Sequence, residues 1–113
     1  MTEVKAEIGD RPTLQEISDA LSTKSFKVIT ITHVDTSTGV LSDVKAISEV
    51  VKKQSPNTLI IVDGVCSVGS EEIYVDEWGL DVVITASQKA IGVPSGLSIS
   101  VASERAIVSR FSF

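Results

Sequence analysis

Cysteine, histidine and aromatic side chains are scarce in this sequence. The 113 residues contain one cysteine and one histidine, and only 4% of them are aromatic. A lone Cys66 cannot form an internal disulfide, whereas small secreted domains depend on several, so we expect an intracellular protein. Metal sites require clustered ligands, and the sequence offers no such cluster, so we expect no metal site.

Basic residues and long hydrophobic runs are also in short supply. Ten Lys and Arg against fifteen Asp and Glu give a formal net charge of -5, which argues against nucleic acid or an anionic membrane as a partner. Aliphatic runs such as Leu59–Val62 are far shorter than the roughly 18 residues of a membrane span, and the N-terminal residues lack the apolar core of a signal peptide. The 42% of hydrophobic residues is nevertheless enough for the core of one domain.

Short β-branched segments alternate with amphipathic ones along the chain. The β-branched segments are bounded by turn residues and predict strands over Val28–Thr32, Leu59–Val62, Val82–Thr85 and Leu97–Val101. Between the first two, apolar residues recur at helical spacing in Ser42–Lys53, which predicts a helix with lysines at its C-terminal end. Nearer the start, Thr13-Leu14-Gln15-Glu16 fits a capping box and predicts another helix behind it.

This order of elements predicts an α/β fold with a mostly parallel sheet flanked by helices. A strand, a crossover helix and a second strand within about forty residues form a βαβ unit, whose strands run parallel. The turn residues Pro94-Ser95-Gly96 could reverse the chain, so the last strand could run antiparallel. A final helix could then begin at Ser103 and extend to Arg110.

Two charged residues stand alone among apolar or small residues. Asp63 is the only ionisable acid or base in residues 54–70, and Lys89 is the only one in residues 82–103. Each follows a predicted strand, so in a parallel sheet both are expected at the carboxyl edge, where open α/β sheets bind ligands.

The pattern leaves three interpretations of this pair open. Buried charges are usually paired, so Asp63 and Lys89 could form an ion pair in a cofactor-free binding or structural module. Asp63-Gly64 is also a preferred sequence for a type I′ hairpin turn. Alternatively, a desolvated lysine becomes a neutral amine that attacks a carbonyl to form a Schiff base, while an aspartate holds a protonated ring nitrogen. Pyridoxal phosphate chemistry requires both groups.

Three successive motifs resemble those of the class V aminotransferases, which depend on pyridoxal phosphate. They are THVDTSTGVL at 32–41, VDGVCSVG at 62–69 and TASQKA at 85–90. Within this family the chain is most similar to the alanine–glyoxylate (serine–pyruvate) aminotransferases, from about Val4 to its C-terminus. The resemblance implies transfer of an amino group from alanine or serine to glyoxylate or pyruvate, on the large domain of a fold-type I enzyme.

The resemblance also implies roles for individual residues. Lys89 becomes the Schiff-base lysine, which moves a proton between the substrate and the cofactor as general base and then acid. Asp63 binds the pyridine nitrogen through a charge-assisted hydrogen bond, and Val65 packs under the ring. Thr36 falls where the family has a hydroxyl near the phenolic oxygen of the cofactor. Gln88 falls where a side chain helps to hold the phosphate.

Neighbouring residues refine the resemblance. Ser37 or Thr38 could take the role given to Thr36 after a one-residue shift. Cysteine desulfurases are similar to this family but have His in place of Gln88 immediately before the lysine, and their reactive cysteine lies in a later segment. We therefore interpret Cys66 as a packed small residue and not as a nucleophile.

The remaining conspicuous residues are expected to be structural. The acidic stretch from Glu71 to Asp81 contains no basic residue, and we interpret it as a solvated loop or helix surface. Trp78, which lies within it, is expected to pack. The only histidine, His33, follows a strand and is interpreted as a structural residue with satisfied hydrogen bonds.

Members of this family are several times longer than the present chain. By the resemblance, residues 1–113 form part of the cofactor-binding large domain, without the glycine-rich phosphate cradle, the stacked aromatic ring and the C-terminal small domain. The arginine that clamps the substrate carboxylate has no match, since neither Arg105 nor Arg110 falls at its position. We expect negligible turnover from the chain alone, and uncovered sheet edges and apolar faces. Full-length relatives are homodimers, found in peroxisomes, mitochondria or cytosol.

Overall fold

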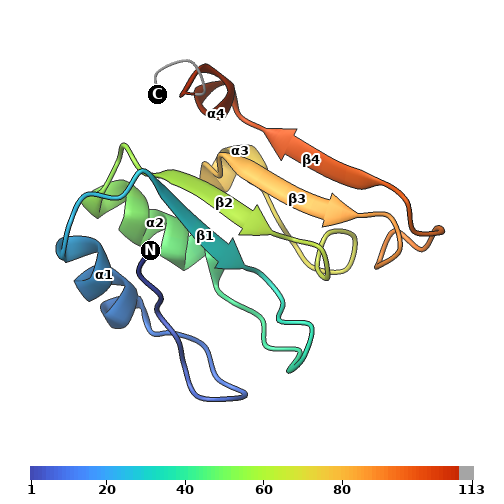
Figure 1. Cartoon of the computed structure of the whole chain (residues 1–113), viewed down its shortest axis with the longest axis horizontal. Helices are drawn as coiled ribbons and strands as arrows, with labels where there is room; N and C mark the ends of the chain where they lie inside the picture. Colours follow the sequence, from blue (N-terminus) through green and yellow to red (C-terminus); the bar gives the residue numbers. More distant parts are fainter. Residues whose placement is uncertain (110–113) are drawn as a thin grey trace.

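The structure is a computed structural model that describes residues 1–109. The elements in chain order are α1 (Leu14–Ser22), β1 (Val28–Thr32), α2 (Val44–Gln54), β2 (Leu59–Asp63), α3 (Val75–Trp78), β3 (Val82–Ala86), β4 (Ser98–Ala102) and α4 (Glu104–Ser109). Figure 1 shows helices and strands alternating along the chain as far as β3, after which β4 follows without an intervening helix. The α/β class is confirmed. The final helix is present, and Arg110, to which it was expected to extend, lies outside the described residues.

The four strands form one sheet in the order β1-β2-β3-β4. β1 pairs in parallel with β2 and β2 with β3, whereas β4 runs antiparallel to β3, which confirms the predicted reversal. In this register Thr32 lies beside Asp63, and Asp63 lies beside Ile84. The C-terminal ends of β1, β2 and β3 therefore meet at one edge of the sheet, which we call the carboxyl edge.

Local sequence explains where the first two helices begin. The Thr13 hydroxyl accepts a hydrogen bond from the backbone N–H of Glu16, and the Glu16 carboxylate accepts one from the N–H of Thr13, which completes the predicted capping box. α2 begins two residues later than predicted, because the Asp43 side chain caps it by accepting a hydrogen bond from the N–H of Ala46.

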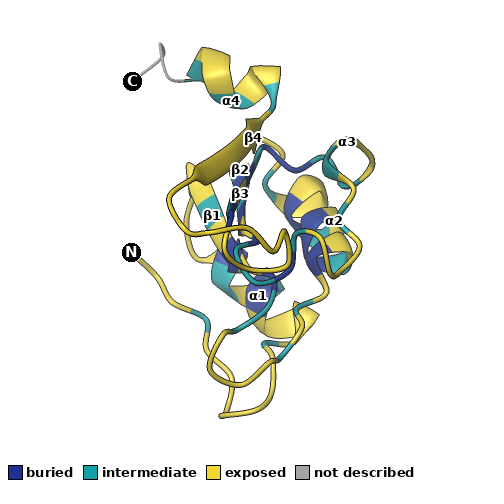
Figure 2. Ribbon diagram, turned by 90° about the vertical axis from the view of Figure 1, so that its right-hand side faces the viewer, coloured by how far each residue is buried: buried dark blue, intermediate teal, exposed yellow. Residues whose placement is uncertain are grey.

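The hydrophobic core lies between one face of the sheet and the helices. In Figure 2, the buried residues gather between the strands and α1 and α2, which lie with α3 on the same side of the sheet. Apolar residues of the strands face apolar residues of the helices in this layer, among them Ile17, Leu21, Ile31, Val44, Ile47, Val51, Ile60, Val62 and Val83. Trp78 packs against the core, as predicted.

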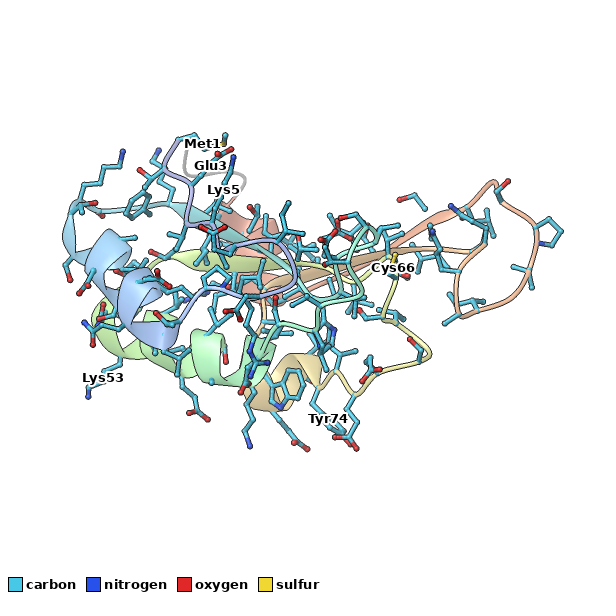
Figure 3. All side chains as sticks on the ribbon, turned by 90° about the horizontal axis from the view of Figure 1, so that it is seen from below. Met1, Glu3, Lys5, Lys53, Cys66 and Tyr74 are labelled. Carbon is cyan, nitrogen blue, oxygen red and sulfur yellow. The ribbon has the colours of Figure 1, made fainter. Side chains whose placement is uncertain are left out.

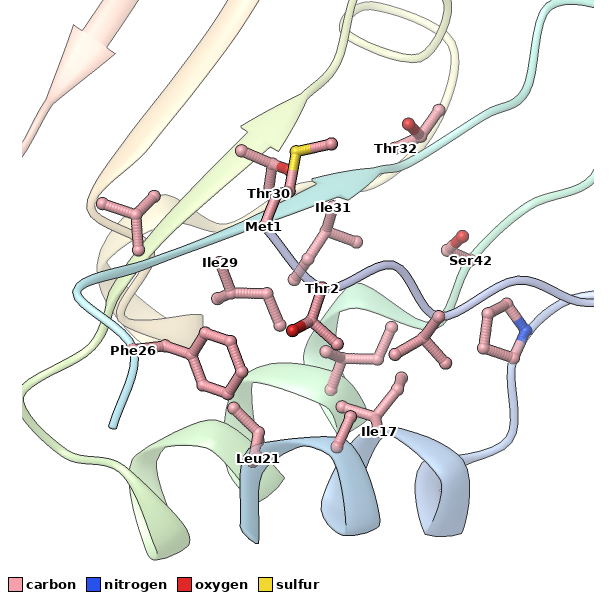
Figure 4. Close-up of a pocket in the computed structure, with 15 residues that line it drawn as sticks. Met1, Thr2, Ile17, Leu21, Phe26, Ile29, Thr30, Ile31, Thr32 and Ser42 are labelled. Atoms are coloured by element: carbon pink, nitrogen blue, oxygen red, sulfur yellow. The ribbon is translucent and has the colours of Figure 1, made fainter. Parts of the chain in front are cut away.

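Within residues 1–109, the face of the sheet opposite the helices and the edge strand β4 are exposed. Val28 is 39% exposed and Ile84 36% exposed, and every residue of β4 is exposed. A cavity of about 480 Å³ lies beside the edge strand β1, under the N-terminal residues (Figure 4), and none of the predicted site residues lines it. Parallel sheets normally have both faces covered, whereas apolar residues on this face are exposed, as expected from the sequence. Within residues 1–109 no helix is both long and apolar enough to cross a membrane.

Asp81 corrects the interpretation of the acidic stretch as solvated surface. Its side chain is buried and accepts hydrogen bonds from the N–H of Ile60, the Ser103 hydroxyl and the Arg105 guanidinium. Burial raises the pKa of Asp81, but these hydrogen bonds outweigh it and hold the pKa below its ordinary value. Arg105 also donates to the carbonyl of Thr58. This cluster fixes α4 to the amino ends of β2 and β3, opposite the carboxyl edge.

Candidate functional site

Three loops leave the carboxyl edge and, together with Asp63 at the end of β2, carry every predicted site residue. The β1 loop (33–42) carries Thr36. The β2 loop (64–70) follows Asp63 and carries Val65, and the β3 loop (87–97) carries Gln88 and Lys89. Figure 3 shows Cys66 of the β2 loop on the opposite side of the molecule from Lys53, which lies near the end of α2. The sheet topology therefore brings the three sequence motifs to one side of the protein.

Asp35 shapes the β1 loop. Its carboxylate accepts hydrogen bonds from the N–H and hydroxyl of Ser37 and from the Thr38 hydroxyl, and its carbonyl accepts from the N–H of Gly39. The hydrogen bonds from Ser37 and Thr38 hold the pKa of Asp35 below its ordinary value. Thr36 is exposed within this turn. Sequence reasoning missed Asp35, although Asp followed by Ser, Thr and Gly is a typical signal for a side-chain-capped turn.

The β2 loop begins at Gly64, and the structure excludes a hairpin turn at Asp63-Gly64. β2 and β3 are parallel, and neither residue has the positive φ of a type I′ turn. A Cβ at Gly64 would lie only 2.8 Å from Cγ2 of Val68, so glycine is needed here for space. Oδ1 of Asp63 accepts a hydrogen bond from the N–H of half-buried Val65, which fixes the first turn of the loop.

Ser87 shapes the β3 loop. It is 1% exposed, its hydroxyl donates to the carbonyl of Pro94, and its backbone N–H donates to the carbonyl of Leu97. These bonds draw the two ends of the loop together and leave Gln88 and Lys89 exposed between them. Sequence reasoning missed Ser87, because the loop that it closes has no regular period.

Two side-chain contacts join the β1 and β2 loops. Nδ1 of His33 lies 2.9 Å from Oγ of Ser67, and Oγ1 of Thr36 lies 3.0 Å from Sγ of half-buried Cys66. His33 is buried and hydrogen-bonded, as its structural interpretation predicted. Burial lowers the pKa of His33, although the charge of Glu71 acts in the opposite direction.

The β2 and β3 loops also pack against each other. The N–H of Gly64 donates to the carbonyl of Ile84, which continues the sheet pairing beyond the end of β2. A Cβ placed at Gly69 would lie 3.4 Å from Cβ of Ala90, the residue after Lys89. The turn after Asp63 is thereby held beside the turn that carries Lys89.

The expectation that Asp63 and Lys89 are desolvated is wrong, and so is the ion-pair interpretation. Both residues are exposed. Among the described residues the ion pairs are Lys5–Glu3 and Arg105–Asp81, and the side-chain amine of Lys89 has no hydrogen-bond or ion-pair partner there. The isolation of these two charges in the sequence therefore reflects the uncharged residues of the loops around them and not burial.

Comparison with known proteins establishes the family. The family model described as aminotransferase class-V matches residues 2–110. The chain belongs to the class V aminotransferase family.

Individual relatives agree with this assignment. The chain is 57% identical over 98 residues to alanine–glyoxylate aminotransferase 1 of Saccharomyces cerevisiae, covering 87% of the chain and 26% of the relative. It is 37% identical over 107 residues to the serine–glyoxylate aminotransferase of Arabidopsis thaliana, covering 92% and 27%. The crystal structure of ureidoglycine–glyoxylate aminotransferase from Bacillus subtilis superposes with a TM-score of 0.88 at 31% identity, covering 96% and 28%. The chain thus spans about a quarter of the length of these relatives.

Family membership implies pyridoxal phosphate as the cofactor, and the groups at the carboxyl edge fit it. Oδ1 of Asp63 accepts a hydrogen bond from the N–H of Val65, whereas Oδ2 has no hydrogen-bond partner within residues 1–109. A free carboxylate oxygen suits a protonated ring nitrogen, and the free Lys89 amine suits an aldehyde. The exposed Thr36 hydroxyl and Gln88 amide add neutral hydrogen-bonding groups.

Proposed function

We propose that this chain supplies the cofactor-anchoring part of a pyridoxal phosphate-dependent aminotransferase that transfers the amino group of alanine, or serine, to glyoxylate, or pyruvate. With alanine and glyoxylate the products are pyruvate and glycine, so one amino group moves and no external oxidant or reductant is needed. The observation that carries the proposal is the unpartnered Oδ2 of Asp63, at the end of β2, and the unpartnered amine of Lys89, on the adjoining β3 loop at the same sheet edge.

Each residue of the site has a distinct role in this proposal. Bound pyridoxal phosphate supplies an aldehyde that takes up the amino group and a ring that withdraws electrons from the substrate α-carbon. The Lys89 amine first anchors the cofactor and then moves a proton at the α-carbon. Asp63 keeps the ring nitrogen protonated, and Val65 packs against the ring. Thr36 and Gln88 donate hydrogen bonds to the phenolic oxygen and the phosphate.

The substrate proposal draws on the relatives. Those compared above share glyoxylate in their names, whereas the amino donor is alanine, serine or ureidoglycine. Glyoxylate is therefore the best supported acceptor. Alanine is the best supported donor, because the yeast relative has the highest identity of the three at 57%.

The site within this chain is only part of what transamination requires. We place residues 1–113 in the large domain of a longer, homodimeric enzyme in which other segments contribute the phosphate cradle, the stacked ring and the substrate-binding arginine. Arg105 does not serve as that arginine, because it binds Asp81 at the opposite edge of the sheet. Without positioning of phosphate and substrate, the advantage of a bound reactant is largely lost, so the 113-residue chain should show no turnover.

Selective labelling of Lys89 tests the proposal. The purified chain is incubated with pyridoxal phosphate, reduced with borohydride and digested, and the labelled lysines are mapped by mass spectrometry. Label concentrated on Lys89, retained in a Lys53→Ala control and lost in Lys89→Ala, supports the proposal; Lys53 is likewise exposed but lies on α2. Label spread evenly over the exposed lysines would overturn it.

A further inference from the structure

We propose that His33 is a positioning residue that, through Ser67, holds the β1 loop against the β2 loop and so fixes Thr36 relative to Asp63. The inference rests on the proposed function for the roles of Thr36 and Asp63, and on the geometry for everything else. His33 and Ser67 are 34 residues apart in the sequence, and their side chains meet at 2.9 Å.

Burial makes this hydrogen bond selective for one arrangement of the loops. His33 is 3% exposed and Ser67 is 0% exposed. A buried polar group without a partner is costly, since it has lost its water and gained nothing in exchange. Any displacement of one loop that separates the imidazole from the hydroxyl therefore leaves two buried polar groups unsatisfied, and the paired arrangement is favoured.

Backbone hydrogen bonds fix the positions of both His33 and Ser67, so the bond between their side chains joins two segments that are already ordered. The N–H of His33 donates to the carbonyl of Asp63, and the carbonyl of His33 accepts from the N–H of Ser42. The N–H of Ser67 donates to the carbonyl of Gly64, which closes the turn after Asp63. The His33–Ser67 bond connects the start of the β1 loop with the middle of the β2 loop.

The residues next to this bond are those of the proposed site. Thr36 lies three residues after His33 and contacts Cys66, the neighbour of Ser67. Val65, which packs against the cofactor ring in the proposal, lies two residues before Ser67. Loss of the His33–Ser67 bond should loosen the Thr36–Cys66 contact and widen the space between the two loops.

The chemistry of the imidazole provides a conservative substitution. Nδ1 lies two bonds beyond Cβ, and the amide of asparagine places a polar atom at the same distance along the side chain. His33→Asn should therefore preserve the bond to Ser67, whereas His33→Ala removes it. Ser67→Ala removes it from the other side with a smaller change in volume, so one of the two alanine variants remains informative if the other fails to fold.

Thiol reactivity measures the loop contact without any cofactor. Cys66 is the only cysteine of the chain and lies at this junction, so its reaction rate with 5,5′-dithiobis(2-nitrobenzoic acid) reports how tightly the loops are held. We expect the rate to rise roughly fivefold in His33→Ala and Ser67→Ala, the factor that one net hydrogen bond contributes. The double variant should add nothing further, because both single variants remove the same bond. His33→Asn should react like the wild type.

Ser48→Ala is the matched control. Ser48 is as fully buried as Ser67, and its hydroxyl bonds the carbonyl of Lys45 within α2, away from the loops. Its replacement should leave the thiol rate unchanged. Urea unfolding of all variants shows whether an increase in rate exceeds that expected from lower stability.

Lys89 labelling by pyridoxal phosphate is the second readout. If the bond positions the site, half-maximal labelling should need a roughly fivefold higher cofactor concentration in the two alanine variants and be restored in His33→Asn. If the wild type is not labelled at Lys89, the proposed function fails, while the thiol rates still decide whether the bond holds the loops. Unchanged thiol rates, unchanged labelling in the alanine variants, or His33→Asn behaving like His33→Ala would each overturn the proposal.

Discussion

Replacing Asp81 by alanine should destabilise the chain far more than replacing another acidic residue of the same stretch. Asp81 is 3% exposed, and its carboxylate accepts hydrogen bonds from the N–H of Ile60 at 2.8 Å, from Ser103 Oγ at 3.0 Å and from Arg105 Nε and Nη2 at 2.8 and 2.7 Å. Asp81→Ala removes every one of these acceptors at once. The Ile60 N–H, the Ser103 hydroxyl and the Arg105 guanidinium each lose this acceptor.

The expected magnitude follows from how far each of these donors is exposed. A buried N–H without a partner costs about 1 to 3 kcal/mol. The Arg105 side chain is 46% exposed and keeps its bonds to the carbonyls of Pro56 and Thr58, so water compensates much of its lost ion pair. We therefore expect a loss of about 3 kcal/mol, the lower end of the range for removing one partner of a buried ion pair.

Urea unfolding followed by Trp78 fluorescence and circular dichroism measures this loss. Asp76→Ala is the control, because Asp76 is exposed on α3 in the same stretch and should change the unfolding free energy by less than about 0.5 kcal/mol. Asp81→Asn keeps an acceptor for Ile60 and should lose roughly half as much as Asp81→Ala. Equal losses in Asp81→Ala and Asp76→Ala would refute the reasoning.

Lowering the pH should remove the contribution of the Asp81 carboxylate to the free energy of unfolding in the wild-type chain. The folded-state pKa of Asp81 lies below the unfolded value, so its contribution to stability is complete above about pH 4 and is lost as the pH falls through the folded pKa. Asp81→Asn should remove this component of the acid dependence. A wild type and an Asp81→Asn variant that lose stability in parallel below pH 4 would contradict the assignment.

Three further predictions concern the loops and the first helix. Gly64→Ala places a Cβ 2.8 Å from Val68 Cγ2 and should lower the unfolding free energy by about 1 to 3 kcal/mol. An unchanged urea midpoint would show that the β2 loop accommodates the added methyl group and would contradict this prediction. Burial lowers the pKa of His33, so protonation favours the unfolded chain, and the unfolding free energy should fall as the pH drops from about 6.5 through the folded pKa. Urea unfolding at several pH values should show this fall in the wild type and not in His33→Asn. Thr13→Ala removes the cap of α1 and its reciprocal bond with Glu16 and should cost about 1 kcal/mol in thermal or urea unfolding, whereas a cost near zero would mean that packing alone fixes the start of the helix.

Local periodicity was sufficient to predict every element of the fold except the short helix α3, whose residues were interpreted only as loop or helix surface. β1 has the predicted bounds, β2 and β3 each extend one residue further at the C-terminal end, and β4 is shifted by one residue at both ends. Those differences arise because pairing in a sheet, and not the chemistry of one side chain, decides where a strand ends; Asp63 extends β2 because it pairs with Thr32. The antiparallel β4 was also predictable, because turn residues precede it.

Burial of charged groups could not be predicted from the local pattern. Asp81 looked like part of a solvated acidic surface, yet it is buried because Arg105 lies 24 residues later in the chain and beside it in space. Asp63 and Lys89 looked desolvated, yet both are exposed, because burial depends on what covers the carboxyl edge. The His33–Ser67 contact joins residues 34 positions apart, and no periodicity of either segment indicates it.

Transamination by a chimaera tests the central claim most directly. The matching 98-residue segment of the yeast alanine–glyoxylate aminotransferase, 57% identical to this chain, is replaced by the segment of this chain, and pyruvate formation from alanine and glyoxylate is measured. The account predicts an active chimaera whose turnover falls by at least about a hundredfold in Lys89→Ala, while the Lys53→Ala control stays near the parent. A folded chimaera without activity, or one that keeps its activity in Lys89→Ala, would contradict it.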